Sequence, residues 1–481
     1  MKLIDYYYKK YEHTPIDAMN YAIARIRGFY ALAILFKDYP GEINVERKDS
    51  LMILAVADGE TYLASDVPAI LKYARDVYYI GNREMGRLRA GEITFYNQDG
   101  DEIEKECKQI EWDAEAAEKA GYEHFMMKEI HEQPKAIRDT MNSVVKDGKI
   151  DLSGMELSED EIRKIRQIYI VACGSAWHVG MVAQYVIEDL TRIPVRVELA
   201  SEFRYRRPIL DPDGLVIIIS QSGETADSLA ALREAKAQGV KTLGIVNVVG
   251  SSIAREADNV FYTLAGPEIA VATTKAYSTQ LIAAYILAIQ FAKVRGQIDG
   301  ERYSSLLEEM ATLPDKIESI LQDTERIQWF AAKQANTRDI FFVGRGIDYA
   351  ISLEGSLKLK EISYIHSEAY AAGELKHGTI SLIEDGTLVI GILTQQELYE
   401  KCVSNMVECK SRGAYLMALT NRGNYSMEDT AEFVVYVPKT DEHFAASLAV
   451  VPLQLLAYYV SVARGLDVDK PRNLAKSVTV E

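Results

Sequence analysis

The sequence is poor in the residues that mark metal, disulfide and nucleotide sites. Its 481 residues include only four cysteines, seven histidines and three tryptophans, and no two cysteines form a CxxC pair. Without such pairs or a metal-type Cys/His spacing, we expect no disulfide framework, no metal site and a reducing, cytoplasmic environment. HExxH, Walker A and GxGxxG motifs are also absent from the sequence, so we expect no cofactor.

Positive charge is scarce as well. Lysine and arginine number 54 against 71 acidic residues, which gives a net charge of −17. This balance argues against nucleic acid or an anionic membrane as the main partner, so local donors must hold any anionic ligand. The start, MKLIDYYYKK, lacks the apolar run of a signal peptide.

One uncharged segment, Phe444–Ala463, is long enough to span a bilayer. It contains Pro452, Gln454 and Ser461, and an equivalent segment occurs earlier in the chain. We therefore predict a buried helix there.

The most informative stretch is LVIIISQSGETADSLAALREAK, residues 215–236. The β-branched run Val216–Ile219 predicts a buried parallel strand. The turn SQSGET (220–225) follows, and apolar residues at helical spacing come next. Such a turn aims hydroxyls and N–H groups of a helix N-terminus at one point, which suits a phosphate monoester. The alternative is an ordinary βα turn with a Ser or Thr N-cap.

The chain also changes character along its length. Residues 1–110 alternate short strands, Asp-Gly turns and helical stretches at 15–26 and 67–75, which is typical of an α+β layer. Residues 111–155 form a charged helical pattern that includes KEIHEQP at 128–134. This pattern is typical of a solvated linker or a packing helix.

The remainder contains an internal duplication. EAKAQGVKTLGIVN and ECKSRGAYLMALTN lie 174 residues apart, as do QLIAAY and QLLAYY, and IYIVACGSA resembles IFFVGRGID. These matches in register predict an α/β fold of two doubly wound domains with parallel sheets. The expected boundaries are 156–297 for the first domain, 298–468 for the second and 469–481 for a C-terminal tail.

The two copies differ in their polar residues. Where the first copy has SQSGET, the second has LTQQEL (393–398), which lacks the glycine and the three hydroxyl side chains of the first turn. The second copy instead carries the stretch Glu354–Gly378, which is dense in ionisable residues. We expect the first copy to hold the phosphate and the second copy to supply acid–base groups.

Several of those ionisable residues are candidates for chemistry. Glu354, Lys358 and Glu361 share one helix face, where a pair of surface salt bridges is the alternative interpretation. His377 lies beside glycines in a predicted loop and is either a proton shuttle or a surface residue. His366, in an apolar helical stretch, is predicted to be structural.

The C-terminal tail leaves two interpretations open. Pro471 prevents a helix, and tails of this kind are usually disordered. However, Leu474, Val478 and Val480 could dock the tail on the protein. Lys476 is either a solvated amine or an imine-forming nucleophile, and the residues alone do not decide.

Together, these motifs resemble one enzyme family. ELASEFRYR (198–206), SQSGETAD, AGPEIAVATTKAYSTQL (265–281), the stretch 354–378 and DKPRNLAKSVTVE (469–481) resemble the glucosamine-6-phosphate synthases, the isomerizing glutamine–fructose-6-phosphate aminotransferases. The resemblance covers essentially the whole chain. It implies two sugar isomerase (SIS) domains behind a glutaminase domain of the N-terminal-nucleophile type. It also implies a homodimer that makes glucosamine 6-phosphate from fructose 6-phosphate, for UDP-N-acetylglucosamine synthesis.

The resemblance further implies roles for single residues. Lys476 would form an imine with the open-chain ketose, His377 would open the sugar ring across a dimer interface, and Glu361, with Lys358 nearby, would move a proton between C1 and C2. The implied phosphate ligands are Ser220, Gln221, Ser222 and Thr225, and the implied sugar contacts are Ser175, Val271, Thr273 and Ala475.

The sequence departs from the family in two places. Where the family commonly has CGTS, this chain has Cys173-Gly174-Ser175-Ala176, which removes one hydroxyl, and Thr273 replaces a common Ser. The family glutaminase needs Cys as its first residue, whereas this chain begins Met1-Lys2. We therefore expect only a partial glutaminase domain at 1–110, no glutamine hydrolysis, and use of free ammonium or simple isomerisation instead.

Two other functions compete with this prediction. A fructosamine-phosphate deglycase also resembles a tandem SIS protein, but the glutaminase-like front and the KPRNLAKSVTVE tail argue against it. A non-catalytic sugar-phosphate sensor would need only the phosphate turn, so the presence of Lys358, Glu361, His377 and Lys476 together argues against that interpretation.

Overall fold

A computed structural model describes residues 1–110 and 118–478. The chain forms two compact units. The first comprises residues 1–118 with the short segments 224–226 and 477–481, and the second comprises residues 119–223 and 227–476.

Where the structure describes it, the first unit contains two antiparallel sheets and three helices, as expected for an α+β layer. The sheet orders are β1-β2-β6-β7-β8 and β4-β3-β5-β9. The β3–β4 hairpin turns at Asp58-Gly59, both with positive φ, which is the I′-type turn that the Asp-Gly pair predicts. The elements are α1 (Lys2–Tyr11), α2 (Pro15–Ile23), β1 (Tyr30–Ile34), β2 (Ile43–Lys48), β3 (Ile53–Ala57), β4 (Glu60–Ala64), α3 (Val67–Ile70), β5 (Asp76–Tyr79), β6 (Met85–Arg89), β7 (Glu92–Tyr96), β8 (Glu102–Ile103) and β9 (Lys108–Gln109).

The second unit contains two five-stranded parallel sheets with the same topology. Their orders are β13-β12-β14-β15-β16 and β18-β17-β19-β20-β21, the 2-1-3-4-5 order of a doubly wound fold. The duplication and the fold class predicted from the sequence are therefore confirmed. The strands are β12 (Gln167–Ala172), β13 (Val195–Leu199), β14 (Gly214–Ser220), β15 (Lys241–Val246), β16 (Asn259–Tyr262), β17 (Asp339–Gly344), β18 (His366–Ala371), β19 (Leu388–Leu393), β20 (Tyr415–Asn421) and β21 (Phe433–Val437). A short hairpin, β10 (Val145–Lys146) with β11 (Lys149–Ile150), precedes the first sheet.

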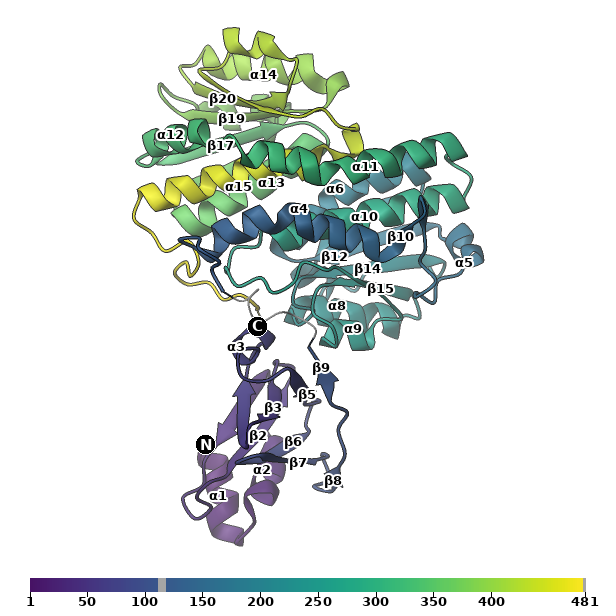
Figure 1. Ribbon diagram of the computed structural model, residues 1–481, viewed down its shortest axis with the longest axis vertical. Helices are drawn as coiled ribbons and strands as arrows, with labels where there is room; N and C mark the ends of the chain where they lie inside the picture. Colours follow the sequence, from purple (N-terminus) through teal and green to yellow (C-terminus); the bar gives the residue numbers. More distant parts are fainter. Residues whose placement is uncertain (111–117, 479–481) are drawn as a thin grey trace. The chain divides into compact units, whose positions relative to one another are not determined.

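Helices fill the space between the two sheets of this unit and cover their other faces (Figure 1). One apolar core runs through both sheets and the helices between them. The helices are α4 (Phe125–Val144), α5 (Glu159–Lys164), α6 (Gly174–Thr191), α7 (Ala200–Phe203), α8 (Ala226–Ala237), α9 (Ser252–Glu256), α10 (Lys275–Val294), α11 (Gly300–Leu321), α12 (Glu325–Gln334), α13 (Ile347–Ser363), α14 (Tyr399–Lys410) and α15 (Ala445–Ala463). Short 3₁₀ turns are η2 (Glu374–His377), η3 (Thr379–Leu382), η4 (Gln396–Leu398), η5 (Tyr425–Asp429) and η6 (Glu442–Phe444).

Helices α15 and α4 test two predictions made from the sequence. The apolar segment is α15, and the structure buries 89% of its most hydrophobic window, so the predicted buried helix is confirmed. The connector forms α4, which packs against α10 and α11 and buries the polar residues Lys128, Glu129 and Gln133. It is therefore a packing helix, and the alternative of a solvated linker is wrong.

The environment of His366 differs from the prediction. Helix α13 ends at Ser363 because Tyr364 adopts a left-handed backbone with φ of 60°. His366 then begins β18, where it is exposed and its Nδ1 hydrogen-bonds to Asp339 Oδ1 at 2.9 Å. The expectation that it lies in an apolar helical stretch is wrong.

Candidate active site

The SQSGET turn joins β14 to α8, as its strand–turn–helix pattern predicts. Ser220 is the buried last residue of β14, and its Oγ accepts the Gly223 N–H at 3.1 Å. Asn247 N–H donates to the Gln221 carbonyl at 3.2 Å, and Ile253 N–H donates to the Gly223 carbonyl at 3.0 Å. These backbone bonds tie the turn to α9 and to the residue after β15.

Glycine is required in this turn. Gly223 has a φ of +65°, a backbone region that L side chains rarely adopt. A Cβ at this position would also collide with the side chain of Ser251. The turn can therefore keep its close backbone path only with glycine.

The face of α13 that carries Glu354, Lys358 and Glu361 is buried. Lys358 Nζ lies 3.5 Å from Glu354 Oε1 and 2.5 Å from Glu361 Oε2. The side chains of Lys358 and Glu354 are 1% and 0% exposed, while that of Glu361 is 22% exposed. The surface-salt-bridge interpretation is therefore wrong, and one carboxylate of the network, Glu361, reaches solvent-accessible space.

Glu354 connects this network to the first SIS copy. Ser175 Oγ donates to Glu354 Oε1 at 2.9 Å, and His178 Nδ1 hydrogen-bonds to Glu354 Oε2 at 2.7 Å. Burial would lower the pKa of Lys358, but the negative charges of Glu361 and Glu354 outweigh burial and raise it. Lys358 is thus held as a cation between two carboxylates.

Lys476 is not a solvated amine. Its Nζ donates to Glu268 Oε2 at 2.7 Å and to the Ala270 carbonyl at 2.8 Å. Burial would raise the pKa of Glu268, but the Lys476 ammonium and the N–H groups of Ala276 and Thr274 outweigh it and hold that pKa below its usual range. Thr273 Oγ1 donates to the same Glu268 oxygen at 2.9 Å.

The tail docks through contacts other than those expected. The Asp469 carboxylate accepts the N–H groups of Phe125 and Met126 at the start of α4, both at 2.9 Å. The Asp469 carbonyl accepts the Val271 N–H at 3.0 Å. The side chains of Leu474 and Val478 are exposed, so neither docks the tail through apolar contacts. Val478 nevertheless holds the tail through its backbone, because its carbonyl accepts the Ala226 N–H at 3.1 Å. Val480 lies outside the described residues.

The two charged clusters share one electrostatic environment. The negative charge of Glu268, which binds Lys476, also raises the pKa of Lys358, which binds Glu361. That Lys476, Glu361 and Lys358 act at one site stays a prediction. His377 ends η2 and is exposed, and no contact in the described part of the chain joins it to these residues. Ala475 is exposed beside Lys476.

Sequence reasoning missed the residues that anchor the lysines. Glu268 and His178 are buried polar residues with partners in the site, but no role was assigned to either. Glu268 lies within the motif AGPEIAVATTK, directly before the predicted sugar contacts. A lone carboxylate in an apolar segment is seldom buried without a partner, so its position was the available signal.

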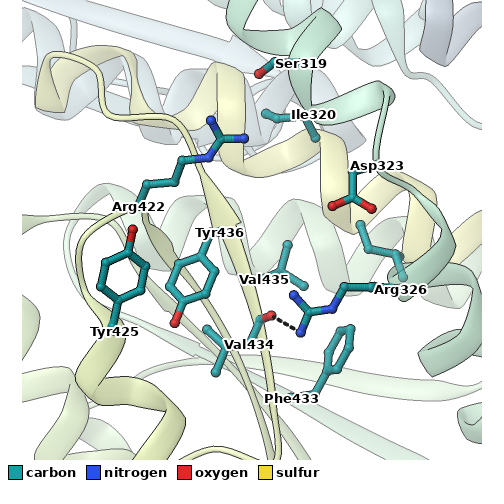
Figure 2. A pocket seen from close by; sticks show the side chains of 11 residues that line it. Ser319, Ile320, Asp323, Arg326, Arg422, Tyr425, Phe433, Val434, Val435 and Tyr436 are labelled. Atoms are coloured by element: carbon teal, nitrogen blue, oxygen red, sulfur yellow. Dashed lines mark hydrogen bonds between the residues drawn. The ribbon is translucent and has the colours of Figure 1, made fainter.

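A separate cavity lies elsewhere in the second SIS copy. It has a volume of about 240 Å³ and includes none of the predicted site residues. Figure 2 shows Arg422 above Tyr425 and Tyr436 on one side of the cavity, and Arg326 beside Phe433 on the other. Arg326 donates to the Val434 carbonyl at 3.5 Å and lies 5.5 Å from the Phe433 ring centroid. These contacts stabilise the packing of α12 on β21.

Comparisons with known proteins agree with this architecture. A family model of the SIS domain matches residues 161–290 and 334–464. Aminotransferases named glutamine–fructose-6-phosphate aminotransferase (isomerizing) from Clostridium tetani and Caldanaerobacter subterraneus are 53% and 52% identical over 480 residues. The chain belongs to this family. The matches cover 100% of this chain and 78% of each relative.

A solved structure of a family member resembles the second unit. The C-terminal domain of the Francisella tularensis glucosamine–fructose-6-phosphate aminotransferase is 38% identical, with a TM-score of 0.71. That match covers 73% of this chain and 100% of the solved chain. A glucosamine-6-phosphate deaminase of Thermotoga maritima is 26% identical, with a TM-score of 0.58. The family resemblance noted from the motifs is therefore confirmed.

Proposed function

We propose that this chain converts fructose 6-phosphate and ammonia into glucosamine 6-phosphate and water. Two observations support the proposal: a partly buried amine, Lys476, is bound to Glu268, and a buried carboxylate network ends in Glu361. The relatives' name supports the substrate, since it specifies fructose 6-phosphate and isomerization. The expected cytoplasmic location remains a prediction.

In the proposed reaction, the first SIS copy anchors the sugar by its phosphate. Ser220, Gln221, Ser222 and Thr225 of the turn after β14 would donate to the phosphate oxygens, together with N–H groups at the start of α8. Ser175, Val271, Thr273 and Ala475 would line the sugar. Anchoring the phosphate places the reacting carbons at a fixed distance from the turn, so acid–base groups can act on C1 and C2.

Lys476 would activate the ketose carbonyl. In its free-amine form, Nζ adds to C2 of the open-chain sugar and water leaves, which gives an imine. Ammonia then adds to C2, and the lysine leaves as the amine, so nitrogen from ammonia remains on the sugar. Glu268 and the Ala270 carbonyl orient Nζ before the attack.

Glu361 would complete the isomerisation. It removes a proton from C1 and returns a proton to C2, which converts the ketose imine into the amino aldose. Lys358 lies 2.5 Å from Glu361 and orients that carboxylate. His377 would open the sugar ring from the neighbouring subunit of a homodimer, which agrees with its exposure and its lack of contact with the other site residues in the described part of the chain.

The competing functions make different predictions. A deglycase would act on a fructosamine phosphate, and a sensor would bind sugar phosphate without turnover. A sensor would not need a buried lysine between two carboxylates, because burying such charges is costly and only binding would be required. This observation favours the enzyme.

The decisive experiment is product formation from fructose 6-phosphate by the purified chain, with ammonium and with glutamine as separate nitrogen donors. We expect glucosamine 6-phosphate from ammonium, and the glutamine assay tests the expected lack of glutamine hydrolysis. Binding without any conversion would favour the sensor, and conversion of a fructosamine phosphate alone would favour the deglycase. Product from glutamine would refute the predicted lack of glutamine hydrolysis.

A further inference from the structure

The position of the Lys476 amine depends on a segment without regular structure. Both of its partners, Glu268 and the Ala270 carbonyl, lie between β16 and α10, where the chain has neither helix nor strand. Something outside this segment must hold it, because an unsupported loop would let the amine move.

Glu129 of α4 holds this segment. Its Oε1 accepts the N–H groups of Ile269 and Ala270, at 2.5 Å and 3.2 Å. Ala270 is therefore bound twice, with its N–H on Glu129 and its carbonyl on Lys476 Nζ. Glu129 is only 2% exposed, so the bonds are shielded from water.

The state of the Glu129 carboxyl is unusual. Burial and the negative charge of Glu268 raise its pKa to about 8, although Lys476, the Ile269 N–H and Lys275 oppose the rise. Its second oxygen, Oε2, is buried and has no hydrogen-bond partner in the described part of the chain. A buried carboxyl oxygen without a donor is the natural place for a proton, so Glu129 is mainly neutral at pH 7.

We propose that Glu129 is a positioning residue for Lys476, which from α4 holds the loop whose Glu268 and Ala270 fix the amine. The inference rests on the proposed imine chemistry of Lys476. Glu129 would not touch the substrate. In its neutral form it ties the loop without placing a second negative charge beside the amine.

Helix α4 also offers a matched control. Glu132 lies one turn from Glu129 on the same helix, but its carboxylate binds Lys275 at 2.6 Å and Lys128 at 3.4 Å. In the described part of the chain it makes no hydrogen bond to the loop. Glu132→Gln therefore repeats the chemical change without touching the loop.

The test is borohydride trapping of the imine with fructose 6-phosphate on the full chain, with the adduct located by peptide mass. We expect Glu129→Gln to trap at close to the wild-type rate at pH 7, because the amide oxygen can still accept both N–H groups. Glu129→Ala should slow trapping about 100-fold, the cost of an amine displaced by about 1 Å. Glu132→Gln should trap normally.

Trapping rates measured over a pH series distinguish positioning of the amine from simple structural support. This comparison needs only wild type and the Glu129→Gln variant. The charged groups facing Glu129 are Glu268 of the loop, Lys476 of the tail and Lys275 of α10. As pH rises through about 8, wild-type Glu129 ionises and places a second negative charge beside the Lys476 nitrogen, whereas the amide of the Glu129→Gln variant stays neutral. The ratio of trapping rates, Glu129→Gln over wild type, should therefore rise with pH, and a flat ratio would overturn the inference.

The outcomes also distinguish this inference from the proposed function. If wild type traps no adduct at Lys476, the imine proposal itself fails. If wild type forms the Lys476 adduct and Glu129→Ala, folded by circular dichroism, forms it at the same rate, only the role of Glu129 is refuted.

Discussion

The two SIS copies share one strand order, but different groups hold the loop after the third strand in each copy. In the first copy, the loop after β14 is bound through its backbone, and Ser220 Oγ accepts from within the turn. In the second copy, the loop after β19 is bound by a side chain of its own domain. The Asp348 carboxylate accepts the N–H groups of Thr394 and Gln395 at 2.8 Å and 3.2 Å, and also the Thr394 hydroxyl.

Aligning the two copies shows which residue causes the difference between the two loops. Asp348 follows β17 as Ala176 follows β12, in the matched segments IFFVGRGID and IYIVACGSA. The first copy therefore has no internal carboxylate at this place. The N–H groups of Thr394 and Gln395 already bind this internal carboxylate, so they are not available to a phosphate in the second copy.

The helices after these segments differ in the same way. The buried positions Glu354 and Lys358 of α13 correspond to Val182 and Val186 of α6, which are both fully buried. At these positions α6 packs through apolar side chains, whereas α13 carries a buried charged network. The duplicated fold thus provides two similar frames, and we propose that the first copy binds the sugar phosphate while the second supplies acid–base groups.

The largest expected effect comes from removing the charge that only the second copy has. Lys358→Met should lower the free energy of unfolding by about 3–5 kcal/mol, because Glu354 and Glu361 would lose the cation between them. Urea denaturation of the purified chain measures this value. Lys360→Met, at an exposed position of the same helix, is the control and should change stability by less than about 0.5 kcal/mol. Equal stability of the two variants would show that the network is not held together by Lys358.

The next effect concerns the internal carboxylate of the second copy. Burial raises the pKa of Asp348 to about 6, against the opposing hydrogen bonds from Thr394 and Gln395. A raised pKa stabilises the fold below the unfolded value and loses that contribution as pH rises through about 6. The stability of wild type minus that of Asp348→Asn should therefore fall by about 3 kcal/mol between pH 4 and pH 7. A difference that is constant with pH would contradict this assignment.

A smaller effect, on sugar-phosphate affinity, should follow from replacing Ala176 of the first copy with the aspartate that the second copy has at this position. Ala176→Asp should place a carboxylate against the loop after β14 and compete with the sugar phosphate. We expect the Kd for fructose 6-phosphate to rise about 10- to 100-fold, the value of one or two charge-assisted hydrogen bonds. Isothermal titration calorimetry measures this Kd, and the neutral variant Ala176→Asn is the control. Unchanged affinity in Ala176→Asp would mean that the phosphate binds elsewhere.

Much of this comparison could be predicted from the sequence. The β-branched run before SQSGET and the helical spacing after it predicted β14 and α8, and the repeat predicted the second sheet. Spacing could not predict that Glu354 and Lys358 are buried, because i,i+4 pairs look alike on exposed and buried helices. Their burial depends on the contacts of α13 with α6 and α15, which are distant in sequence.

The anchors of Lys476 could not be predicted for the same reason. Glu129, Glu268 and Asp469 come from a helix, a loop and the tail, and only the folded chain brings them together. Apolar docking of the tail by the Leu474 and Val478 side chains was wrong, because the Asp469 carboxylate and the Val478 carbonyl hold the tail by hydrogen bonds.

The division of labour between the copies is tested most directly by measuring both Kd and kcat for fructose 6-phosphate in two variants, with ammonium as the nitrogen donor. Ser222→Ala with Thr225→Ala, in the first copy, should raise Kd by about 10- to 100-fold. Glu361→Gln, in the second copy, should leave Kd close to the wild-type value and lower kcat by about 10²- to 10⁴-fold. Normal affinity in the loop variant, or lost affinity with normal turnover in Glu361→Gln, would contradict the account.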